Sequence, residues 1–181
     1  ISRAFWSETL YDIPVGAHYT AATPNVGSRR ATISMTLGES CGTGLARLEL
    51  ECGWSRLLVL EALWATVLHY HSGSRDVVFA GVRRDAGFPG VDSCVGFLDQ
   101  TYPVRVSVEP NETFNTLFTK LGDYHASASS HAYLGYKEIT RDLPKAVNTV
   151  ITYSPALNGP TTAGQLMGFP MAVFITGTSP V

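Results

Sequence analysis

The strongest constraint on the fold is an apolar stretch with helical spacing that runs from Ser55 to residue 72. Apolar residues recur along it at intervals of three and four: Leu57, Leu60, Trp64, Val67 and Leu68. A second set widens the same stripe: Leu58, Ala62, Leu63 and Ala65. Ser55 is a suitable N-cap. Because a helix that is apolar around most of its circumference is buried, we expect this one to pack between a sheet and other elements.

Strands and helices alternate along the rest of the chain. Period-two and continuous apolar runs predict strands at 29–37, 76–82, 97–108, 147–154 and 171–177. Further helices are expected at 3–11 with Ser2 as cap, 43–52, 111–129 and 134–142. The inner face expected for the helix 111–129 comprises Phe114, Leu117, Phe118, Leu121 and Tyr124. Loops rich in Pro and Gly fill 12–28, 88–93 and 155–168. The alternation indicates an α/β domain with a two-layer mixed β-sheet and helices packed on one face.

Composition excludes several classes of protein. The 181 residues are 45% apolar and 15% charged, which is globular and is enough for roughly one domain. A net charge of −2 leaves no basic field for a nucleic acid. Cys41, Cys52 and Cys94 are too few for a disulfide framework or a zinc site, and they favour a reducing, cytoplasmic location. No apolar run approaches the roughly 20 residues of a membrane span, and no signal peptide is visible. Since the chain begins at Ile1, we expect it to be processed or a piece of a longer protein.

The sharpest short motif is GESCG at residues 38–42, which matches the G-x-S-x-G nucleophile elbow of serine hydrolases. Aspartates follow Ser40, and His125 and His131 come later, so the order of nucleophile, acid and base is possible. Only one strand is expected before Ser40, whereas that fold builds several strands beneath the elbow. A glycine-rich helix start explains the motif equally, and the hydrolase remains an alternative hypothesis.

Three smaller signals favour structural roles. His69 and His71 lie about 200° apart on a helix, so they cannot share a metal ion and are better placed to meet the carbonyls at the helix end. Cys94 has no base placed beside it and is expected to be a packed thiol. The sequon that begins at Asn111 is better explained as a helix start. We expect no metal site.

A longer ordered set of segments resembles the C-terminal half of the condensation domains of nonribosomal peptide synthetases. The buried helix leads through HSGSRDVVFAGV into a strand, a proline-glycine loop follows, and VGFLDQTYPVRV at 95–106 is similar to the family's VG-x-x-(I/V)NT-x-PVR motif. HAYLGYKEI at 131–139 resembles the HAHLG form associated with fungal synthetases. NTVITYSP and the opening AFWSETL match the next strand and the end of the bridging region.

Two departures limit what the resemblance implies. Asp99-Gln100-Thr101 replaces the usual Ile/Val-Asn-Thr, so a role of that Asn cannot be transferred. The catalytic HHxxxDG motif is not in these residues, and in the family it belongs to the N-terminal half. We therefore expect no catalytic residue in this fragment, which alone would be inactive. Its expected organisation is a bridging helix and linker at 1–28 and a C-terminal lobe at 29–181.

The resemblance implies a lobe like that of chloramphenicol acetyltransferase. Two such lobes enclose a tunnel, and carrier-protein domains bring acyl groups to it on phosphopantetheine arms. The expected partners are thus the N-terminal lobe and peptidyl carrier proteins, and the expected reaction is amide, ester or ring formation. The residues expected to line the tunnel or bind there are Gly81, Arg83, Gly96, Phe97, Gln100, Thr101 and Tyr102. The loop at about 86–96 is expected at the tunnel floor.

The surroundings of Arg83 or Arg84 and the role of Arg105 are considered separately. Arg83 or Arg84 faces either the tunnel or a solvated rim, and the rim is favoured. Arg105 matches the motif arginine and is expected to be a paired structural charge. A third hypothesis for the whole chain, beside the condensation lobe and the hydrolase, is a noncatalytic binding lobe. The residues do not reveal the donor and acceptor substrates.

Overall fold

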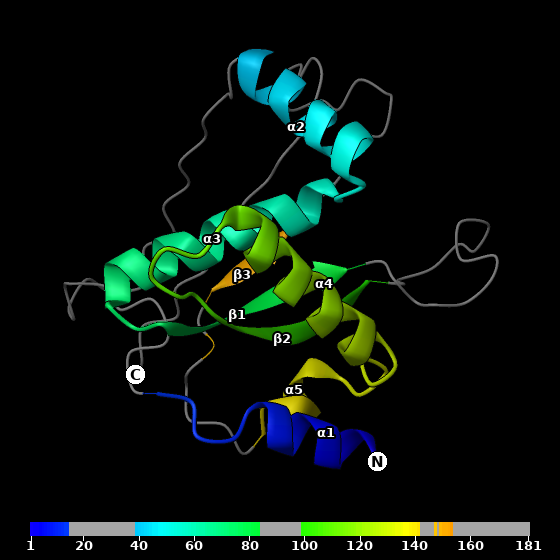
Figure 1. Ribbon diagram of the computed structural model, residues 1–181. Helices are drawn as coiled ribbons and strands as arrows, with labels where there is room; N and C mark the ends of the chain where they lie inside the picture. Colours follow the sequence, from blue (N-terminus) through cyan, green and yellow to red (C-terminus); the bar gives the residue numbers. More distant parts are fainter. Residues whose placement is uncertain (15–38, 84–98, 142–146, 148, 154–181) are drawn as a thin grey trace, which may run out of the picture.

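The computed structural model describes residues 1–14, 39–83, 99–141, 147 and 149–153. They form helices and strands of one mixed α/β arrangement (Figure 1). The elements are α1 (Ser2–Thr9), α2 (Glu39–Cys52), α3 (Arg56–Ser72), β1 (Asp76–Arg83), β2 (Gln100–Ser107), α4 (Phe114–Ser129), α5 (Tyr136–Ile139) and β3 (Val150–Thr152). The strands expected at 29–37 and 171–177, and the loops at 88–93 and 155–168, lie outside the described residues.

The sheet of the described residues is mixed, as expected. Its strand order is β2-β1-β3. β1 and β2 are antiparallel, with register partners from Asp76 and Ser107 at one end to Arg83 and Gln100 at the other. β1 and β3 are parallel. Pro103 lies in β2, at the edge of this sheet, where a missing N–H is tolerated.

The predicted helix at 55–72 is confirmed as α3. The Ser55 side chain accepts a hydrogen bond from the Leu58 N–H at 3.3 Å, and Gly73 ends the helix in the left-handed conformation at φ 70°. α3 packs on β1, β3 and α4, and its buried residues include Ala62, Ala65 and Leu68. The expectation that Leu63 and Val67 lie on the buried stripe is wrong, because they are 45% and 50% exposed. They occupy the face of α3 turned away from the sheet.

α4 lies on the same face of the sheet as α3 (Figure 1). Thr113 caps it by accepting from the Thr116 N–H at 3.2 Å. Leu117, Phe118 and Leu121 are buried as expected. Phe114, expected on the inner face, is 49% exposed because it lies in the first turn, where it stacks on Phe118 at a ring distance of 6.0 Å.

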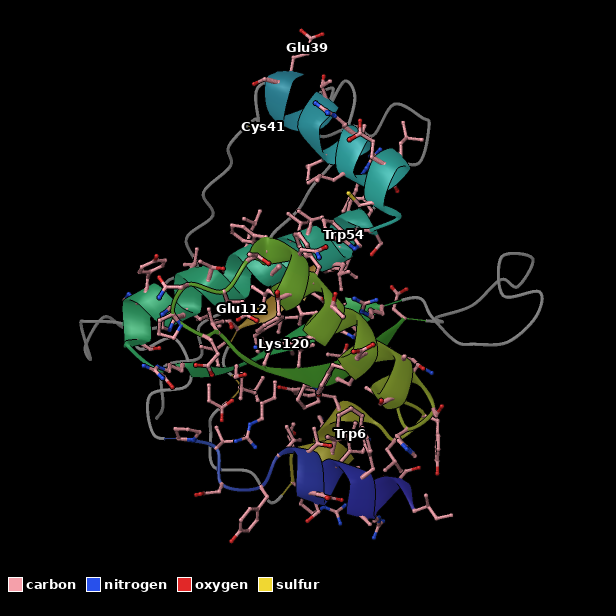
Figure 2. The ribbon with its side chains drawn as sticks, viewed as in Figure 1. Trp6, Glu39, Cys41, Trp54, Glu112 and Lys120 are labelled. Carbon is pink, nitrogen blue, oxygen red and sulfur yellow. The ribbon has the colours of Figure 1, made fainter. Side chains whose placement is uncertain are left out.

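Side chains of α4 also cover the outer edge of β2. The Tyr124 hydroxyl donates to the Pro103 carbonyl, and Lys120 Nζ donates to the Ser107 carbonyl at 3.2 Å. Figure 2 shows Lys120 beside Glu112, with which it forms an ion pair at 2.7 Å. These contacts satisfy carbonyl groups that would otherwise offer a pairing edge to another chain.

α1 joins the core through Trp6 and Leu10, which are 2% and 3% exposed. Trp6 Nε1 donates to the His131 carbonyl at 3.0 Å, which fastens α1 to the segment before α5. The expectation that Ser2 caps α1 is wrong, since the cap position is Ile1. The Ser2 hydroxyl instead bonds His131 Nδ1 at 2.9 Å and the Tyr133 hydroxyl at 2.8 Å.

Candidate functional site

A hollow of about 280 Å³ lies where β2 begins. One wall is the strand start, with Asp99, Gln100 and Thr101. The other wall is the turn that leads into α5, formed by Ala132, Tyr133, Leu134, Gly135 and Tyr136. The structure therefore brings the described part of VGFLDQTYPVRV, which starts at Asp99, next to HAYLGYKEI, and both segments carry the family resemblance. Gln100 and Thr101, both expected at the tunnel, lie here side by side.

The hollow combines polar and apolar groups. Asp99, Gln100 and Thr101 supply polar groups, while Ala132 and Leu134 supply apolar surface. Partial burial raises the pKa of the Tyr136 phenol above its ordinary value, so that phenol is a neutral donor and acceptor at neutral pH. Such a mixed surface suits a chain that carries amide or ester groups.

Arg83 does not face a solvated rim, and that expectation is wrong. It is 9% exposed, and its Nη2 pairs with Glu61 Oε2 of α3 at 2.7 Å. The physical reason is that a charge at the end of a buried strand needs a partner, and α3 provides one. A role of Arg83 at a tunnel stays a prediction.

Gly81 and Tyr102 are register partners in the core. Tyr102 is 1% exposed, and its hydroxyl bonds His125 Nδ1 at 2.9 Å. A Cβ on Gly81 would lie 2.8 Å from Glu61 Oε1 and 3.3 Å from Val104 Cγ2, so a larger residue here would press on the Glu61 carboxylate. Tunnel roles for Gly81 and Tyr102 stay predictions.

Arg105 is a paired charge that joins three parts of the chain. Its Nε donates to both Asp76 carboxylate oxygens at 3.0 Å, and Nη1 donates to the Thr9 carbonyl at 3.0 Å and the Tyr11 carbonyl at 2.6 Å. The hydrogen bond to Asp76 raises the pKa of Arg105 above its ordinary value. Arg105 thereby holds the end of α1 to the sheet.

Several candidate residues lie outside the described part of the chain. They are Arg84, the loop 86–96 with Cys94 and Gly96, and Phe97. Among the described residues, no group of three or more His, Cys, Asp or Glu side chains is placed to hold a metal ion. His69 Nδ1 lies 2.8 Å from the carbonyl of Ser74, which follows the end of α3, so it contacts a backbone carbonyl but not one of the helix itself.

The described residues do not assemble a serine hydrolase triad on Ser40. Ser40 is exposed in the first turn of α2, and Figure 2 shows its neighbours Glu39 and Cys41 at the end of α2 farthest from the sheet. His125 lies between a hydroxyl and a carboxylate, but these belong to Tyr102 and Glu61. His131 bonds Ser2. Residues 39–42 of the motif form the first turn of α2, as the alternative of a glycine-rich helix start predicts.

Glu61 is the residue that sequence reasoning missed, and His125, considered there only as a base for Ser40, is its partner. Glu61 is 0% exposed, and its Oε2 lies 2.7 Å from His125 Nε2. A signal was present for Glu61, because it is the only charged residue between Leu57 and Leu68 in a helix that is otherwise apolar. A charge at such a position must meet a partner inside the protein.

Solved structures first define the fold. The first condensation domain of the CDA synthetase superposes with a TM-score of 0.68 at 20% identity, over 90% of this chain and 36% of that one. The first condensation domain of the calcium-dependent antibiotic synthetase, in complex with a substrate analogue, gives 0.67 at 22% identity, with the same coverage. The chain thus has part of the condensation-domain fold, the mixed sheet and helices expected of a chloramphenicol-acetyltransferase-like lobe.

The family follows from the sequence. The model of the condensation domain family matches residues 2–161, and the chain belongs to that family. A plipastatin synthase polypeptide of Bacillus subtilis is 26% identical over 152 residues, which is 79% of this chain and 6% of that protein. Nonribosomal peptide synthetase SIDD of Beauveria bassiana is 29% identical over 146 residues, 78% of this chain and 7% of that protein. Since these relatives come from a bacterium and a fungus, a fungal source stays a prediction.

Proposed function

We propose that the chain is the C-terminal lobe of a condensation domain that joins carrier-bound aminoacyl or peptidyl thioesters. The main support for this proposal is the match of the condensation domain family to residues 2–161. The chain also spans only about a third of the solved condensation domains that it resembles. Within this proposal, residues 1–28 form the bridging helix and linker and 29–181 form the lobe.

The hollow at the start of β2 supports a role as tunnel wall. A phosphopantetheine arm is an uncharged chain of amides beyond its phosphate, and the hollow offers polar groups from Gln100 and Thr101 beside apolar surface from Leu134. The general base is expected from the HHxxxDG segment on the other lobe, so this chain binds and orients and does not move the proton. The bond formed is an amide, an ester or a ring closure.

The expected partners are the N-terminal lobe and peptidyl carrier proteins. Among the described residues, no helix has the length and apolarity needed to cross a membrane. Cys41 and Cys52 are free and exposed, which fits a reducing compartment, and we propose a cytoplasmic location.

The test joins the chain to the segment that precedes it in its gene and supplies donor and acceptor carrier proteins loaded with aminoacyl groups. Mass spectrometry of the acceptor carrier detects the condensed product. We expect product from the joined polypeptide and none from the 181 residues alone. No product from the joined polypeptide, with both carriers bound, would favour a noncatalytic binding lobe.

A matched pair of variants tests the hollow. Thr101→Trp fills it and is expected to lower condensation about tenfold or more, because a positioned substrate chain is sensitive to displacements of about 1 Å. Tyr70→Trp places the same side chain at an 82% exposed site on α3 and is expected to leave the rate unchanged. Equal rates in the two variants would contradict the assignment of the hollow.

A further inference from the structure

Four buried polar side chains form one continuous network in the core. Glu61 Oε2 lies 2.7 Å from both Arg83 Nη2 and His125 Nε2, and His125 Nδ1 lies 2.9 Å from the Tyr102 hydroxyl. None of the four is more than 9% exposed. Because these residues come from α3, β1, α4 and β2, the network ties the two helices to two neighbouring strands of the described sheet.

The contacts of Glu61 set the direction of its hydrogen bond with His125. Arg83 balances the charge of Glu61, and an ionised carboxylate oxygen only accepts, so His125 donates from Nε2. In the Nε2–H tautomer, Nδ1 accepts from the Tyr102 hydroxyl.

This network ends next to the hollow. Tyr102 directly follows Thr101 in β2, and Arg83 is the register partner of Gln100. Glu61 therefore reaches both strands at the end where Gln100 and Thr101 line the hollow. Its other carboxylate oxygen, Oε1, is buried without a hydrogen-bond partner among the described residues and faces Gly81.

Stability alone does not explain a carboxylate in this position. A buried ion pair commonly contributes no more than well-packed apolar side chains of the same volume, and its best-attested use is to specify one arrangement. α3 is otherwise apolar toward the sheet, with Ala62, Ala65 and Leu68 among its buried residues. The polar network thus specifies how the ends of β1 and β2 are held.

We propose that Glu61 is a positioning residue for the acyl-transfer tunnel, acting through Arg83 and through His125 and Tyr102 to hold Gln100 and Thr101 at the hollow. This inference rests on the proposed function. Glu61 lies on α3 and does not line the hollow, so it acts on the reaction only through its contacts.

The experiment compares Glu61→Gln with Asp76→Asn in the polypeptide joined to its preceding segment. Asp76→Asn is the matched control, because it removes the carboxylate charge from the Arg105–Asp76 ion pair at the other end of the same two strands. Thermal unfolding is measured for both, and kcat/KM is measured well below both transitions. We expect kcat/KM to fall about tenfold in Glu61→Gln and to stay unchanged in Asp76→Asn.

Two further readouts separate positioning from a general loss of structure. Amide hydrogen exchange at Gln100 and Thr101 is expected to accelerate in Glu61→Gln and not in Asp76→Asn. Ring nitrogen shifts of His125 are expected to show the Nε2–H tautomer in the unsubstituted protein. Losses of kcat/KM that simply follow the unfolding temperature in both variants, or unchanged exchange at Gln100 and Thr101, overturn the inference.

The same design distinguishes this inference from the proposed function. An unsubstituted polypeptide that condenses nothing refutes the proposed function and with it a role in the reaction. Exchange and tautomer measurements then still decide whether Glu61 holds the strand ends.

Discussion

The two ends of the β1–β2 pair are both fastened by an arginine and a carboxylate, but in different surroundings. At one end Arg83 and Glu61 are 9% and 0% exposed. At the other end Arg105 and Asp76 are 23% and 25% exposed, and Arg105 also donates to the Thr9 carbonyl at the end of α1. The first pair fixes elements inside the core, while the second holds a terminal helix to the sheet.

The difference shows how surroundings decide the cost of an ion pair. At the buried end water cannot replace a lost partner, so small displacements of Glu61 are costly. At the half-exposed end water can solvate either charge, and the main loss is the set of directed hydrogen bonds from one guanidinium.

The largest effect is expected at the buried end from Gly81→Ala. The new Cβ would lie 2.8 Å from Glu61 Oε1, and Glu61 cannot move aside because Arg83 and His125 hold its other oxygen. Overpacking of this kind costs about 2–3 kcal/mol in the free energy of unfolding. Urea denaturation measures it.

Gly122→Ala is the matched control for that substitution. Gly122 lies inside α4 with nothing within 4 Å of the added Cβ, so alanine should stabilise the helix by about 0.5–1 kcal/mol. Equal effects of the two substitutions would show that Glu61 is free to shift, and the contrast between the two ends would then fail.

An intermediate effect is expected at the half-exposed end from Arg105→Lys. Lysine keeps the charge but cannot reach Asp76 and the carbonyls of Thr9 and Tyr11 together. We expect a loss of about 1–2 kcal/mol. Amide hydrogen exchange in α1 should report α1 loosening before the sheet unfolds.

Arg47→Lys is the control, because the Arg47–Glu51 pair is 73% and 58% exposed and should not change stability measurably. If Arg105→Lys also leaves the free energy of unfolding unchanged, the Arg105–Asp76 pair does not hold α1 to the sheet.

The sequence predicts the elements that have a local signature. α3 and β1 follow from spacing that repeats within a few residues, and Ser55 and Gly73 mark the helix ends. The Glu61–His125 contact joins residues 64 positions apart, and no local pattern encodes such a pairing. For the same reason local spacing favours a solvated rim for Arg83, since its partner lies on another element.

The candidate site is predictable only in part. Gln100 and Thr101 come from the resemblance, and the structure adds the opposite wall from Ala132 to Tyr136. Serine is a favoured N-cap residue, which is why the sequence predicts that Ser2 caps α1. Its hydroxyl instead bonds His131, a residue 129 positions away that no local pattern connects to it.

The smallest effect is expected midway between the two ends, from Tyr124→Phe. The hydroxyl of Tyr124 donates to the Pro103 carbonyl, and its loss should cost about 1 kcal/mol at pH 8. Tyr70→Phe, at an 82% exposed position, should change nothing. A loss at Tyr70 equal to that at Tyr124 would show that α4 does not protect the edge of β2.

Alkaline pH sharpens this last test. Burial raises the pKa of Tyr124 above its ordinary value of 10.0, so above pH 10 the unfolded chain releases a proton that the folded chain retains. The stabilisation from the protonated phenol is complete below pH 10 and is lost as the pH rises through the folded pKa, at up to about 1.4 kcal/mol per pH unit. Tyr124→Phe removes that contribution, so its unfolding free energy should fall less steeply above pH 10 than that of the unsubstituted protein. Parallel curves would mean that the phenol ionises equally in both states, and that α4 does not exclude water from the edge of β2 between its two fastened ends.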